Sequence, residues 1–119
     1  MTFAGIHGVW AWVVVVSNAV AGLWALGAHR LPALRHRALW IVTAAAQVAI
    51  GIQVLLGVLA LQLEEKEIGE FHMFYGFVAF ASVGIIYSYR QQLEAWTYLL
   101  YGFGGLFLMG LGLRAIFLA

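Results

Sequence analysis

Four long, uninterrupted apolar stretches make up most of this sequence and leave few folds open to it. We place them at residues 4–28, 38–62, 70–89 and 95–118. An α-helix needs roughly 20 apolar residues to cross about 30 Å of hydrocarbon, and each stretch reaches that length. The links between them are short, which makes consecutive helices antiparallel neighbours. The sequence therefore predicts an all-α integral membrane protein, an up-down four-helix bundle that forms one domain over residues 1–119.

Composition supports a membrane location and excludes several kinds of site. The chain is 65% hydrophobic and only 9% charged, too little polar surface for a protein in water. It has no cysteine, which excludes disulfides, thiolate metal sites and cysteine nucleophiles. The net charge of +1 gives no indication of a nucleic-acid partner. No nucleophile lies beside a base, and no phosphate loop is present, so we do not expect an enzyme acting by itself.

The loops predict how the chain is oriented. The first loop carries three arginines and the third carries Arg90, whereas the loop over residues 64–70 is mainly acidic. Cationic loops remain on the cytoplasmic side of a membrane. Both chain termini and the acidic loop are therefore predicted to face outward. The expected location is a bacterial inner membrane, with the lipid bilayer as the main partner.

Two histidines are predicted to meet at the outer face. His7 is near the start of the first span and His72 near the start of the third. Two crossings separate them, so both imidazoles return to the same side at similar depth. An ionisable group inside a span is costly and usually has a function. Two imidazoles at one level suit a haem iron or another metal ion, although each alone has a plain explanation as a hydrogen-bonded interfacial residue.

Four other residues complete the predicted cofactor site. Ala11 and Gly76 each lie one helical turn from a histidine, and small side chains there leave room for a flat macrocycle. Arg114, near the outer end of the fourth span, is a candidate partner for haem propionates, or else it reaches lipid phosphates. Gln53 is either an interhelical hydrogen-bonding residue or a contact for a quinone or a haem edge.

The layout resembles the four-helix haem-binding membrane cores of the cytochrome b561 type and each half of haem A synthase. The matching residues are His7, His72 and the Gln-x-x-Leu-Gly stretch of residues 53–57. The resemblance implies a b-type haem with the two histidines as axial ligands, in electron transfer or a quinol-linked step. The chain lacks the second histidine pair of b561-type proteins and the outer-loop cysteine pair of many haem A synthases. Two-haem conduction and haem synthesis are therefore not implied.

Two alternatives remain open at this point. A divalent metal could bind His7 and His72 with carboxylates of the acidic loop, as a metal-binding or transport module. That loop carries Glu64, Glu65, Glu67 and Glu70. The chain could instead be a cofactor-free accessory or anchor subunit of a larger membrane complex, or a homo-oligomer. In that case the glycine stripe of the fourth span, which includes Gly102 and Gly105, would pack against partner chains.

Overall fold

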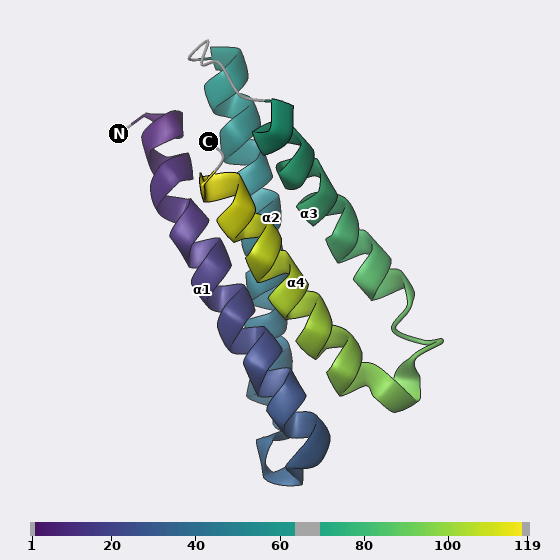
Figure 1. Ribbon diagram of the computed structural model, residues 1–119. Helices are drawn as coiled ribbons and strands as arrows, with labels where there is room; N and C mark the ends of the chain where they lie inside the picture. The colour runs from purple at the N-terminus through teal and green to yellow at the C-terminus, as the bar shows by residue number, and fades with distance from the viewer. Residues whose placement is uncertain (1, 64–69, 118–119) are drawn as a thin grey trace.

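The computed structural model describes residues 2–63 and 70–117, and these residues form four α-helices with no strand (Figure 1). The helices are α1 (Phe3–Arg30), α2 (Arg37–Leu63), α3 (Glu70–Ser88) and α4 (Thr97–Phe117). Short 3-10 turns, Pro32–Leu34 and Glu94–Trp96, lead into α2 and α4. Each predicted span end lies within one helical turn of the observed one, so the predicted all-α four-helix fold is confirmed.

Three of the helical segments are long and apolar enough to cross a membrane, namely α1, α2 and Glu94–Phe117. The apolar part of α3, His72–Ser88, is shorter. Large apolar side chains point outward on every helix, such as Leu23, Val48 and Phe77, which are 61%, 61% and 70% exposed. A surface of this kind is typical of helices that face lipid.

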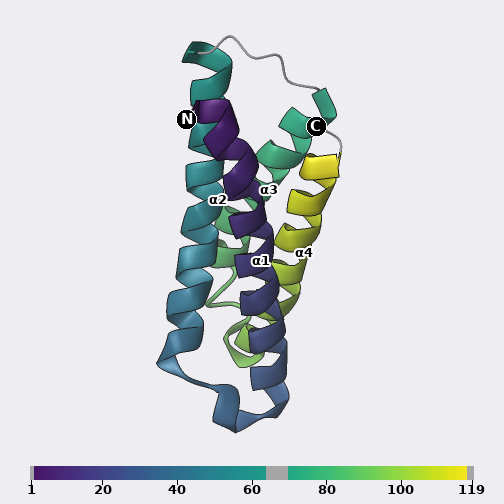
Figure 2. The same ribbon diagram turned by 90° about the vertical axis from the view of Figure 1, so that its left-hand side faces the viewer.

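Helix α1 lies at the centre of the arrangement, because it packs along both α2 and α4. Helix α3 packs mainly on α4 and makes only slight contact with α2. Figures 1 and 2 show the four helices nearly parallel to one another, with both chain termini at the same end. Consecutive helices are thus not equally close neighbours, and the bundle is loosest between α2 and α3.

Glycines account for the close packing of α1 on α4. A Cβ atom added to Gly105 would lie 2.9 Å from the Cα atom of Gly22, and one added to Gly102 would lie 2.5 Å from the Leu26 side chain. Only glycine lets the two backbones approach so closely. The glycine stripe of α4 is therefore used within the chain, and these positions are not available to a partner.

Polar side chains inside the bundle fix α1 against α2. The indole Nε1 of Trp10 donates to the Ala49 carbonyl over 2.8 Å. About two turns after Trp10 on α1, the buried Asn18 side chain donates to the Ala46 carbonyl of α2 over 3.3 Å. An unpaired polar group in hydrocarbon costs several kcal/mol, so these bonds favour one alignment of the two helices. That alignment places the second turn of α1 beside Gln53.

Candidate functional site

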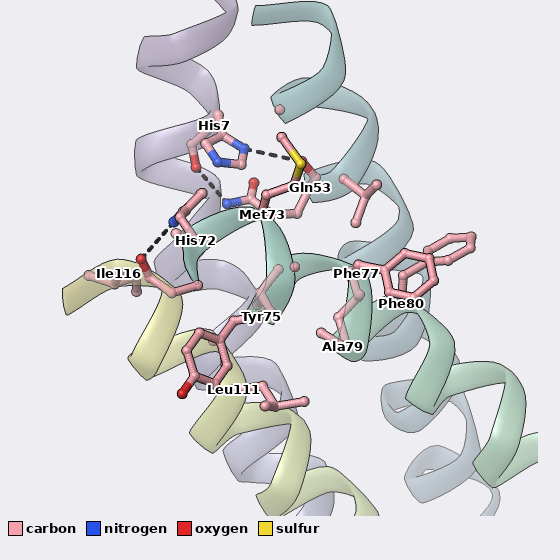
Figure 3. Close-up of a pocket in the computed structure, with 18 of the residues that line it drawn as sticks. His7, Gln53, His72, Met73, Tyr75, Phe77, Ala79, Phe80, Leu111 and Ile116 are labelled. Carbon is pink, nitrogen blue, oxygen red and sulfur yellow. Dashed lines mark hydrogen bonds between the residues drawn. The ribbon is translucent and has the colours of Figure 1, made fainter. Parts of the chain in front are cut away.

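The two histidines singled out in the sequence lie next to each other. His7 projects from α1 and His72 from the first turn of α3, at the end of the bundle that holds the chain termini (Figures 1 and 3). Their ring centroids are 5.8 Å apart, and the ring planes meet at 74°. The structure thus brings both imidazoles to one level of the bundle, as the sequence predicts.

Each histidine makes one hydrogen bond from Nδ1 to a backbone carbonyl. His7 Nδ1 is 3.1 Å from the backbone carbonyl oxygen of Gln53, and His72 Nδ1 is 2.8 Å from that of Ala115. A carbonyl oxygen only accepts, so Nδ1 carries the proton in both rings. In a neutral imidazole the lone pair is then on Nε2. A hydrogen bond that fixes the tautomer in this way is the usual support of a metal-ligating histidine.

The spacing of the rings suits two ligands of one metal ion. A histidine nitrogen binds a transition metal at about 2 Å, so two nitrogens that bind one ion are at most about 4 Å apart. Their ring centroids are then at most about 6 Å apart, since each centroid is about 1 Å behind its nitrogen. The observed 5.8 Å is close to this value. The donor set, two imidazole nitrogens, is also one that haem iron accepts.

Helix α2 holds the His7 ring in place from two sides. The Gln53 side chain donates from Nε2 to the His7 carbonyl over 2.9 Å, while the Gln53 carbonyl accepts from the ring. One turn along, Gly57 provides space for the ring, because a Cβ atom there would lie 3.1 Å from His7 Cε1. The buried Oε1 atom of Gln53 has no hydrogen-bond partner among the described residues. The site thus contains one unused acceptor.

Both histidines line an apolar cavity of about 450 Å³. This volume is within the range of about 300–1,000 Å³ that is typical of small-molecule and cofactor sites. All four helices contribute to its wall, and none of the described residues that line it is Asp, Glu, Lys or Arg. The inner wall consists of buried apolar side chains, including Val14, Ile50, Ala79, Leu108 and Leu111. A cavity lined mainly by apolar side chains, with the two imidazole rings and Gln53 at one end, suits a largely apolar ligand.

The other predicted site residues lie at or beside this cavity. Ala11 and Gly76 both line it, and a Cβ atom added to Gly76 would meet nothing within 4 Å. Gln53 lines it as well. Arg114 does not line it, but its guanidinium carbon is 5.6 Å from the ring centroid of Tyr75, which does. The exposed Arg114 side chain therefore lies at the edge of the site, next to Ala115.

The alternative metal site with acidic ligands is not built by the part of the chain that the structure describes. Residues 64–69, which carry Glu64, Glu65 and Glu67, lie outside the described residues, as does the Glu70 side chain. Among residues 2–63 and 70–117, no three His, Cys, Asp or Glu side chains come close enough to hold a metal ion. The described site offers two imidazole ligands, which suits a cofactor that brings its own remaining ligands.

Three contributions to the site were not predicted from the sequence. The Ala115 carbonyl fixes the His72 ring, Gly57 makes room for the His7 ring, and Tyr75 lies between the cavity and Arg114. Only Gly57 had a sequence signal, because it is one helical turn from Gln53 and shares its face. A backbone carbonyl carries no signal at all, since every residue has one.

Comparisons with protein-family models, curated proteins and solved structures give no match for this chain.

Proposed function

We propose that this protein binds one b-type haem through His7 and His72 and serves in electron transfer, as a subunit of a respiratory or quinol-linked complex in a bacterial inner membrane. The observation that carries the proposal is the position and the hydrogen bonding of the two imidazole rings. They come from different helices, lie 5.8 Å apart between centroids, and both have Nδ1 engaged by a carbonyl. Free Nε2 lone pairs beside an apolar cavity suit haem iron better than any solvent-facing role.

The chain's own residues divide the work of holding such a group. His7 and His72 would hold the iron through their ring nitrogens, and Gln53 and Gly57 set the position of the His7 ring. Ala11 and Gly76 leave space in the cavity one turn from each histidine. Arg114 provides a positive charge at the edge, where carboxylate groups of a haem would reach water. When bound, haem supplies one-electron redox chemistry, tuned by its axial ligands.

A purified sample gives the direct test. The protein is expressed with supplementary haem, isolated in mild detergent, and its visible spectrum is recorded before and after reduction with dithionite. We expect a Soret band in the oxidised sample and sharp α and β bands after reduction, as low-spin bis-imidazole haem gives. Pyridine haemochrome analysis then identifies the haem type and its ratio to protein.

A colourless protein after haem-supplemented expression would overturn the proposal. The favoured function would then be that of a cofactor-free accessory subunit, in which the two histidines only join helices. Analysis of the same sample for zinc, iron and copper after dialysis separates this outcome from a divalent-metal site on the same two rings.

A further inference from the structure

The residues that line the cavity beside the two histidines are more exposed on some sides than on others. On its α1 and α4 sides, Val14, Leu108 and Leu111 are buried and most of the other lining residues are half-buried. Its α2 and α3 sides carry the exposed residues Val58 and Phe77, which are 49% and 70% accessible. We call the opening between these two sides the α2–α3 slot, lined by Val54, Val58, Leu61, Met73, Phe77 and Phe80.

The slot faces lipid and not water, provided the helices span the membrane. Every residue that lines it is apolar, and it continues inward from His72 along α3. Figure 3 shows Phe77 and Phe80 on the side of α3 that points away from α4. Because α3 packs on α4 and touches α2 only slightly, few contacts need to break for the slot to widen.

At the histidine end of the cavity, hydrogen bonds join the helices in pairs. The paired bonds between His7 and Gln53 tie α1 to α2, and the His72–Ala115 bond ties α3 to α4. Among the described residues no such bond joins α2 to α3, so a flat ligand that arrived through the slot would pass only apolar side chains.

We infer that haem reaches His7 and His72 from the bilayer interior, through the α2–α3 slot, and that α3 moves relative to α2 to admit it. The inference rests on the proposed function, since it concerns the same two ligands. Val58 and Phe77 would then form the two edges of the slot between which the cofactor passes.

The absence of native cysteine makes a direct test possible. Val58→Cys and Phe77→Cys are introduced together in the full chain, haem-free protein is placed in lipid nanodiscs, and the two thiols are joined by bis-maleimides of increasing length. The control is the same double variant treated with N-ethylmaleimide, which modifies both thiols without joining the helices. Haem is then supplied from lipid vesicles, and growth of the Soret band gives the rate of uptake.

We expect the joined protein to take up haem roughly tenfold more slowly or not at all, because binding that requires a conformational change is slowed when the change is blocked. Protein joined after it has taken up haem should keep its full Soret band. Equal uptake rates in the joined and control samples would overturn the lateral route alone. Failure of the unmodified parent chain to take up haem would instead overturn the proposed function, and this inference with it.

A second variant keeps the test independent of cross-linking. Phe77→Ala removes a large side chain from the slot edge, and uptake should be faster than in the parent chain. Phe103→Ala is the matched control, because Phe103 is 63% exposed on α4 and does not line the cavity. Uptake that is unchanged by Phe77→Ala, or equally changed by both substitutions, would contradict the proposed route.

Discussion

The His7 ring stands edge-on to the His72 ring at 74°, with 5.8 Å between the ring centroids. Because each ring is bonded to a different helix through Nδ1, neither can take over the position of the other. We therefore expect His7→Ala and His72→Ala each to abolish the low-spin bis-imidazole spectrum of the reduced protein. Spectra of both variants, normalised to protein, provide the measurement.

His29→Ala is the matched control for these two substitutions. The His29 ring stacks on Trp96 with centroids 6.2 Å apart, close to the first loop and away from the cavity. Its loss should leave the spectrum unchanged. If either His7→Ala or His72→Ala retained the parent spectrum, that residue would not be an axial ligand.

Gln53 should affect both the stability of the bundle and the binding of haem. Gln53→Leu removes the donor to the His7 carbonyl, and an interhelical bond of this kind contributes about 0.6–2 kcal/mol. The Gln53 carbonyl remains, so the His7 tautomer is kept while its position is loosened. We expect haem affinity to fall roughly 10-fold, within the range found when the partner of a ligand is removed. Gln47→Leu, at a half-buried residue of α2 that does not line the cavity, should have no such effect on affinity.

Gly57 should tolerate only small changes, because a Cβ atom there would lie 3.1 Å from His7 Cε1. Gly57→Ala requires the ring to shift by a few tenths of an ångström, which should weaken haem binding and broaden the α band. Gly57→Leu should abolish binding. Gly51→Leu, on the same helix, adds a side chain where a Cβ atom meets nothing within 4 Å, and binding should persist. Haem titrations of the three variants decide the matter, and equal affinities would contradict the proposed role of Gly57.

The close packing of α1 on α4 should be equally sensitive to added side chains. A Cβ atom on Gly105 would lie 2.9 Å from Gly22 Cα, so Gly105→Leu forces two backbones apart. Overpacking of this kind costs typically 1–3 kcal/mol, and the midpoint of thermal unfolding in detergent should fall accordingly. Gly110→Leu is the control, because a Cβ atom at Gly110 faces open space. A similar midpoint for both variants would mean that the close contact is not needed for stability.

The fold could be predicted from the sequence much further than the site. Four apolar stretches separated by charged loops determine four helices, and the number of crossings between His7 and His72 brings both to one end of the bundle. How closely each pair of helices packs depends on contacts that no single helix encodes. Gly22 meets Gly105 only once both helices are in place, and this packing makes α1 and α4 central.

The details of the site depend on alignments between helices, which is why most of them could not be predicted. A shift of α4 by one residue would present a different carbonyl to His72, although the sequence would look the same. The α2–α3 slot likewise follows from α3 packing on α4 and not on α2. The apolar composition of the slot residues suits packing and lipid equally well, so the sequence alone does not distinguish the two.

Arg114 should influence the redox potential of the site more than its stability. The exposed side chain lies over Tyr75, with 5.6 Å from the guanidinium carbon to the ring centroid, and Tyr75 lines the cavity. A positive charge there favours the reduced haem, whose net charge is more negative by one. Arg114→Gln should therefore lower the midpoint potential, by up to about 40 mV if the charge contributes up to about 1 kcal/mol, as exposed charges do. Added salt screens exposed charges, so the difference between parent and variant should shrink at high ionic strength.

Arg90→Gln is the control, because Arg90 lies over Tyr87 near the third loop and outside the cavity lining. Spectroelectrochemical titration at low and high salt gives all four potentials, and an unchanged potential in Arg114→Gln would place the haem carboxylates away from this residue.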